Sequence, residues 1–120
     1  MNGEVDLAGR ALVVLQARQS NGNRVQEVTT WVDTAFTGEL VMPRHTIDQL
    51  GLRQSSAVSA GLADGTEVVL ETFSCVVEWF GQARRIEVIE SDAPFPLLGV
   101  GLLRGCKLII DYRLRTLSIT

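Results

Sequence analysis

The stretch from Trp31 to Pro43, Trp-Val-Asp-Thr-Ala-Phe-Thr-Gly-Glu-Leu-Val-Met-Pro, constrains the fold more than any other part of the chain. An apolar run leads into a single carboxylate, Asp33, and a second apolar run, Leu40-Val41-Met42, follows after a turn. This pattern predicts a strand that delivers the carboxylate to a tight loop and a second strand that leaves the loop. An Asp followed by Thr can also form a plain turn through a side-chain to backbone hydrogen bond. Because apolar residues flank Asp33 on both sides, we expect a partly desolvated carboxylate in a functional site.

Turn residues separate several more strand-like segments. Asn21-Gly22 and Asp64-Gly65 are the dipeptides most typical of hairpin turns, and Gly81-Gln82 marks a third turn. A final hairpin is expected around Tyr112 to Arg115. The predicted strands are residues 9–17, 24–32, 40–42, 55–62, 67–79, 84–90, 107–111 and 116–119.

Two short helices interrupt the predicted strands. Pro43 suits the first turn of a helix that presents Ile47 and Leu50 on its apolar face and ends at Gly51. Residues 97–104 fit a short strand that turns into a second short helix. Many short strands with few helices predict an all-β protein, a small closed barrel with one or two short helices.

Length and composition predict one ordinary globular domain. The chain has 120 residues, of which 46% are hydrophobic and 21% are charged, so residues 1–120 are predicted to form a single domain. The net charge of −3 predicts no nucleic-acid partner. Arg84-Arg85 is interpreted as a solvated strand end, and Glu39 and Asp48 as solvated carboxylates. No signal peptide and no membrane-spanning segment are recognised, so we expect a cytoplasmic protein with no membrane partner.

No residue pattern indicates a cofactor or a metal. His45 is the only histidine, and it has no Cys or carboxylate at a metal-ligand spacing. Gly99 and Gly101 lack the third glycine and the surrounding strand–helix–strand unit of a dinucleotide site. Cys75 and Cys106 are expected to be buried free thiols.

The segment Val32 to Gly38, Val-Asp-Thr-Ala-Phe-Thr-Gly, resembles the active-site loop of retroviral-type (retropepsin-like) aspartic proteases. It is most similar to the single-lobed bacterial branch, which carries Asp-Thr-Gly-Phe-Thr-Gly. Further segments resemble the same family in the right order over about Leu12 to Ile119. They are Glu39–Pro43, Leu50–Leu52, Leu62–Thr66 at the place of the family's flap, Pro96–Leu103, Ile109–Tyr112 and Leu117–Ile119.

The resemblance implies a mechanism that needs two copies of the chain. Asp33, Thr34 and Ala35 would form the catalytic loop, with one Asp33 carboxylate from each subunit of a homodimer activating a water molecule. Thr34 would hydrogen-bond across the dimer axis. Ala63, Asp64, Gly65 and Thr66 would form a flap tip that closes over a peptide or protein substrate. The implied activity is that of an aspartic endopeptidase.

Two departures from the family motif keep other interpretations open. Ala35 replaces a Gly, which matters if the loop needs a positive φ or a close approach to the partner loop. Gly101 stands where relatives often carry Asp, and the loss of that polar group is expected to alter local support of the loop. The alternative function is a catalytically silent protease-fold module that dimerises or binds peptides. A third interpretation is an unrelated small β-barrel with a chance Asp-Thr pair.

Overall fold

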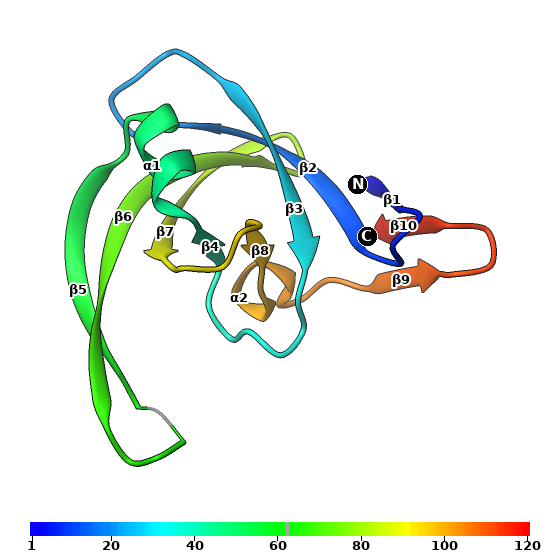
Figure 1. Cartoon of the computed structure of the whole chain (residues 1–120). Helices are drawn as coiled ribbons and strands as arrows, with labels where there is room; N and C mark the ends of the chain where they lie inside the picture. The colour runs from blue at the N-terminus through cyan, green and yellow to red at the C-terminus, as the bar shows by residue number, and fades with distance from the viewer. Residues whose placement is uncertain (62) are drawn as a thin grey trace.

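The computed structural model describes residues 1–61 and 63–120. Most of its secondary structure is β-strand (Figure 1). The strands are Asn2–Val5 (β1), Ala11–Arg18 (β2), Gln26–Val32 (β3), Leu40–Met42 (β4), Arg53–Gly61 (β5), Glu67–Trp79 (β6), Gln82–Glu90 (β7), Leu97–Leu98 (β8), Leu108–Asp111 (β9) and Thr116–Ile119 (β10). The helices are Arg44–Leu50 (α1) and Val100–Leu103 (α2). The predicted all-β class with two short helices is therefore confirmed.

The strands form one continuous sheet that turns back on itself. Their order is β5-β6-β7-β4-β8-β3-β2-β1-β10-β9, and β2 pairs in addition with β6 through Ala17 opposite Val77 and Arg18 opposite Val76. This second pairing joins β6, β7, β4, β8, β3 and β2 into a ring of strands. The β9–β10 hairpin lies to one side of the ring, next to both chain ends (Figure 1).

The core lies inside the ring and follows the strand alternation. Alternate residues of β2 are buried, among them Val13 and Leu15, while their neighbours are more exposed. Buried side chains from the opposite strands include Leu40, Val88 and Leu98, each with none of its surface exposed. Burial of these aliphatic side chains contributes most of the stabilisation of such a fold.

Local sequence explains most of the turns. Gly51 ends α1 with φ +66, the left-handed conformation that glycine adopts without strain. The β6–β7 connection consists of Phe80 and Gly81, with φ +52 and +76, which suits a two-residue hairpin turn. The hairpin predicted around Asn21-Gly22 is confirmed, because β2 and β3 pair antiparallel, and its loop spans residues 19–25. There the guanidinium of Arg18 donates to the carbonyls of Gln19, Ser20 and Gly22 and orders a wider loop.

Other boundaries differ by one or two residues from the prediction. Residues 67–79 and 116–119 are strands as predicted. The N-terminal strand β1 is a strand that the sequence pattern does not predict, and it pairs with both β2 and β10. Leu62, the predicted end of one strand and the start of the flap-like segment, lies outside the described residues.

Candidate active site

The loop that carries Asp33 is held at its start by β8. Trp31 and Val32 of β3 run parallel to Leu97 and Leu98 of β8. The amide of Asp33 donates to the carbonyl of Leu98 at 2.8 Å, so the ladder continues to the carboxylate-bearing residue. On its other side β8 pairs antiparallel with β4. The strands that enter and leave the loop are therefore fixed by the same short strand between them.

The start of α2 holds the far end of the loop. Three successive amides donate to loop carbonyls: Gly99 to Glu39 at 3.0 Å, Val100 to Phe36 at 2.8 Å and Gly101 to Gly38 at 2.9 Å. Gly99 and Gly101 are required by this close approach, because a Cβ on either would overlap backbone atoms of the loop. The loop and the helix therefore form one rigid unit behind Asp33.

The Asp33 carboxylate lies half-buried at the loop surface. One oxygen, Oδ1, accepts the amide of Ala35 at 3.0 Å, and the Asp33 carbonyl accepts the amide of Phe36 at 3.2 Å. These two bonds form the side-chain to backbone turn that an Asp-Thr pair can adopt in any protein. They also fix the orientation of the carboxylate. Among the described residues the other oxygen, Oδ2, has no hydrogen-bond donor. One carboxylate oxygen is thus held and the other is available to a ligand.

Thr34 and Ala35 are exposed at the tip of the same loop. Within residues 1–61 and 63–120, the non-glycine residues with positive φ are Phe80 and Arg115. Ala35 therefore adopts its conformation without the strain that a Cβ meets at positive φ, and the residue is exposed. The predicted contact of Thr34 with a partner copy stays a prediction.

The segment Ala63–Thr66 forms the tip of a long hairpin between β5 and β6. Asp64 Oδ1 accepts the amide of Thr66 at 3.0 Å and its hydroxyl at 2.6 Å, and Gly65 has φ +87. The hydroxyl of Thr66, followed by its amide, lowers the pKa of the Asp64 carboxyl. These bonds make Asp64 a turn-forming residue. Figure 1 shows the hairpin curving away from the ring, with its tip far from the core.

A pocket of about 400 Å³ lies between the Asp33 loop and the hairpin. Phe36 of the loop and Leu70 of β6 both border it, so the loop and the hairpin face a common space. Its remaining lining comes from β4, from β7 and from the segment after β7: Val41, Ile89, Glu90, Ser91 and Asp92. None of the predicted site residues lines this pocket, and no hydrogen bond joins Asp33 to the described residues of the hairpin tip, so the grouping of Asp33 with Ala63–Thr66 stays a prediction.

Two charged residues support the loop through contacts that the sequence pattern does not predict. Glu39 accepts the amide of Glu87 on β7 at 3.1 Å and pairs with Arg84 at 3.5 Å. Arg84 also donates to the carbonyl of Gly101 in α2 at 3.3 Å. The interpretation of both residues as solvated charges is therefore wrong. Their contacts follow from the parallel pairing of β4 with β7, which no local sequence pattern reveals.

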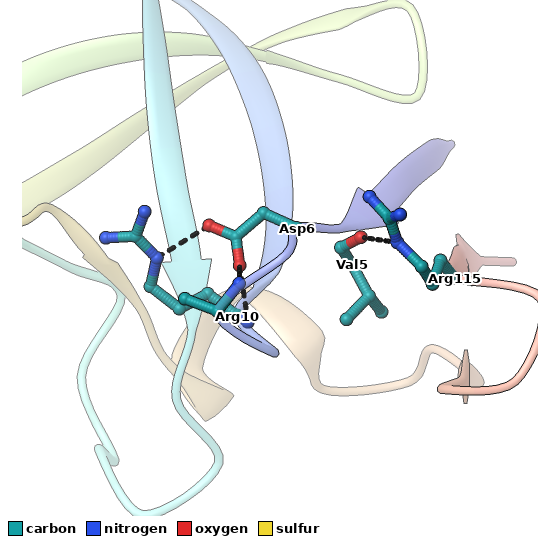
Figure 2. Close-up of polar contacts among 5 residues, drawn as sticks. Val5, Asp6, Arg10 and Arg115 are labelled. Carbon is teal, nitrogen blue, oxygen red and sulfur yellow. Dashed lines mark hydrogen bonds and ion pairs between the residues drawn. The ribbon is translucent and has the colours of Figure 1, made fainter.

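A second polar cluster lies beside the strand that leads to Asp33 (Figure 2). Asp6 accepts the Arg10 amide at 2.8 Å and its guanidinium at 2.7 Å, and the amide bond is the main reason why the pKa of the Asp6 carboxyl is lowered. The Arg10 guanidinium lies 4.9 Å from the ring centre of Phe95 and 6.0 Å from that of Trp31. Trp31, Val32, Asp33 and Leu97 line a pocket of about 340 Å³. A fixed cation and an exposed aromatic face therefore lie close to the carboxylate-bearing loop.

Arg115 adds a further contact, drawn in Figure 2, by donating from Nε to the carbonyl of Val5 at 3.0 Å. It fastens the end of β1 to the start of β10.

Over residues 1–61 and 63–120, no three His, Cys, Asp or Glu side chains gather as metal ligands would. None of the described helices has the length and apolar character needed to cross a membrane.

Comparison with solved structures identifies the class of fold. The chain has the retropepsin-like aspartic protease fold. It is similar to a retropepsin-like aspartic protease from Rickettsia conorii, with a TM-score of 0.68 and 19% identity over 99% of this chain and 88% of that chain. It is also similar to EIAV protease in complex with the inhibitor HBY-793, with a TM-score of 0.61 and 17% identity over 88% of this chain and 97% of that chain. No family model and no curated protein matches the sequence.

Proposed function

We propose that this chain is an aspartic endopeptidase that works as a homodimer, with Asp33 of each subunit in the catalytic pair. The observation that carries the proposal is the position of Asp33. Its amide is fixed by β8, its Oδ1 is held by Ala35, and its Oδ2 has no donor among the described residues of this retropepsin-like fold. One chain supplies one such carboxylate, and the reaction needs two, so a second copy completes the site.

Two adjacent carboxylates share a proton, because like charges in contact cannot both ionise easily. The ionised Asp33 takes a proton from a water molecule, and the protonated Asp33 donates a hydrogen bond to the substrate carbonyl. The water oxygen bonds to the carbonyl carbon and gives a tetrahedral intermediate with no covalent bond to the enzyme. The C–N bond then breaks as the leaving nitrogen takes a proton from the carboxyl pair.

The β5–β6 hairpin is the flap in this proposal, with Ala63, Asp64, Gly65 and Thr66 at its tip. β5 is an edge strand of the sheet, so the hairpin can follow an extended peptide by β-type hydrogen bonding. Closing of the tip would exclude water from the reacting bond. Thr34, exposed beside Asp33, would hold the two catalytic loops together across the dimer axis.

The alternative is a silent module that dimerises or binds peptides without turnover, and Ala35 is the reason to consider it. The unstrained φ of Ala35 removes one objection to activity, which is distortion of the loop within the chain. The remaining objection is crowding between Ala35 and the loop of the partner. This objection concerns only the contact between the two subunits. The Ala35→Gly variant tests it, because it removes the methyl group that would cause the crowding.

The test is cleavage of a diverse peptide mixture between mildly acidic and neutral pH. Wild type, Asp33→Asn and Ala35→Gly would be compared, with sedimentation velocity recorded for each. The proposal expects cleavage by a dimeric wild type and none by Asp33→Asn. Cleavage by Ala35→Gly alone would favour the silent module. A protein that stays monomeric at high concentration and cleaves nothing would refute both the dimer and the activity.

A further inference from the structure

The pocket of about 400 Å³ beside the Asp33 loop has apolar walls. Val41 is buried in its base, and the half-buried side chains of Phe36, Leu70 and Ile89 surround that base. Val41 and Ile89 are register partners on neighbouring strands, so they form a continuous floor. Phe36 follows Asp33 by three positions, and its amide donates to the Asp33 carbonyl. The pocket is therefore joined to the Asp33 loop through Phe36, so a peptide that binds at Asp33 can extend a side chain toward it.

The rim of this pocket carries negative charge. Glu90, Ser91 and Asp92 complete the lining, and two of these three residues are carboxylates. The segment is held in place on both sides of Asp92. The amide of Ser91 donates to the Met42 carbonyl at 3.1 Å, and the Ser91 hydroxyl accepts the Ala93 amide at 3.1 Å. Asp92 is exposed and forms no ion pair with any residue in the described ranges.

The nearby cation does not balance this charge. Arg44 is shared by three carboxylates, at 3.1 Å from Asp48, 3.5 Å from Glu71 and 3.2 Å from Glu90. One guanidinium facing three carboxylates leaves a net negative charge, and the hydrogen bond that Arg44 donates to Glu90 is the main reason why the pKa of Arg44 is raised. Asp92 adds another negative charge at the pocket mouth.

We propose that this pocket binds a lysine or arginine side chain of the peptide, its methylene stem on Phe36, Val41, Leu70 and Ile89 and its cationic head at Asp92. The inference rests on the proposed peptidase function and names the substrate class of that site. Long basic side chains combine an apolar stem with a charged end, which is the combination that this pocket offers. A purely apolar side chain fills the walls but leaves Asp92 without a partner. An acidic side chain meets like charge at the rim.

The first test compares peptides that differ at one position. A scanning library would place lysine, norleucine or glutamate at each position around the cleaved bond. Norleucine keeps the stem of lysine and lacks its charge. A partly exposed ion pair is worth up to about 1 kcal/mol, so kcat/KM for lysine should exceed that for norleucine by about threefold to fivefold at one position. Glutamate should be the poorest of the three at that position. Equal values for lysine and norleucine at every position would overturn the proposal.

Variants of Asp92 test whether the rim of the pocket causes the preference for lysine over norleucine. Asp92→Asn should reduce the lysine-to-norleucine ratio to about one, and Asp92→Lys should favour glutamate over lysine. Glu78→Gln removes one exposed charge at the opposite end of β6 and should keep the ratio of the wild type. The ratio is measured within each variant, so a change in overall activity does not affect it. An unchanged ratio in Asp92→Asn would assign the preference elsewhere and refute this pocket.

A binding measurement separates this proposal from the peptidase proposal. Fluorescein-labelled lysine and norleucine peptides would be titrated with Asp33→Asn protein, in which no turnover is expected, and followed by fluorescence anisotropy. Tighter binding of the lysine peptide, abolished in Asp33→Asn/Asp92→Asn, supports the pocket even if the wild type cleaves nothing. No difference between the two peptides, or no binding of either, contradicts it whatever the outcome of the cleavage assay.

Discussion

Replacing Gly101 by alanine probes how tightly α2 is packed against the catalytic loop. A Cβ at this position would lie 2.8 Å from the carbonyl carbon and oxygen of Gly38 and 2.9 Å from Cγ of Glu39. Two of these three atoms belong to the backbone, which cannot rotate away as a flexible side chain can. The Gly101 amide also donates to the Gly38 carbonyl at 2.9 Å, so separating the two segments lengthens a hydrogen bond. The substitution therefore forces the loop and the helix apart.

The expected cost follows from three contributions. Overpacking of a tight contact costs about 1–3 kcal/mol. Weakening of the hydrogen bond adds about 0.5–1.5 kcal/mol. The higher helix propensity of alanine recovers about 1 kcal/mol, since Gly101 lies within α2. We expect a net loss of about 1–3 kcal/mol in the free energy of unfolding, or a fall in Tm of about 4–12 °C for a chain of this size.

Differential scanning calorimetry of wild type, Gly101→Ala and Gly61→Ala would test this estimate. Gly61 is the matched control, because a Cβ there has no described atom within 4 Å and its φ is not in the left-handed range. Gly61→Ala should leave Tm within about 2 °C of the wild type. If Gly101→Ala is as stable as Gly61→Ala, then the loop and α2 are not in the close contact described, and the account of a rigid unit behind Asp33 fails.

Three further changes test other contacts. Glu39→Ala should cost about 1–2 kcal/mol because the Glu87 amide loses a charged acceptor, whereas Glu39→Gln, which keeps an acceptor, should cost less in the same urea titration. Thr30→Val should cost about 1 kcal/mol, since the buried Thr30 hydroxyl donates to the Val13 carbonyl at 2.8 Å, and an undiminished urea midpoint would contradict this. Burial raises the pKa of the Cys75 thiol from 9.0 to about 11, so the stability that it contributes is present below pH 9 and is lost as the pH rises to 11. The urea midpoint of the wild type should fall over that range more than that of Cys75→Ala.

Local patterns predict the strand–loop–strand at Asp33 because its cause is local. Apolar runs, a short polar turn and the β-rich context define β3 and β4 without knowledge of their neighbours. The same holds for the helix from Arg44 to Leu50, which has Pro43 before it and Gly51 at its end. The hairpin at Asn21-Gly22 is also predicted locally, but the width of its loop is not. Arg18 stabilises a wider loop through three backbone carbonyls, and such a contact overrides the preference of a dipeptide.

Long-range pairing is what the sequence does not predict. Strand β1 has only four residues and weak alternation, and it exists because β2 and β10 lie on either side of it. The support of the loop by Arg84 depends in the same way on β7 running parallel to β4. Residues 84 and 39 are far apart in the chain, so their charges look solvated when each segment is considered alone. The position of the Asp33 carboxylate is thus predictable, but the residues that support it are not.

The lack of a side chain at Gly101 leaves room for the side chain of Glu39. A Cβ on residue 101 would lie 2.9 Å from Cγ of Glu39, so the Glu39 side chain takes up the space next to this position. From the loop, Glu39 reaches both Arg84 and the Glu87 amide, and Arg84 in turn donates to the Gly101 carbonyl. The carboxylate that links the loop to β7 in this chain therefore belongs to the loop itself. It follows that Gly101→Asp should destabilise this chain, because the added group must displace both Glu39 and the backbone of Gly38.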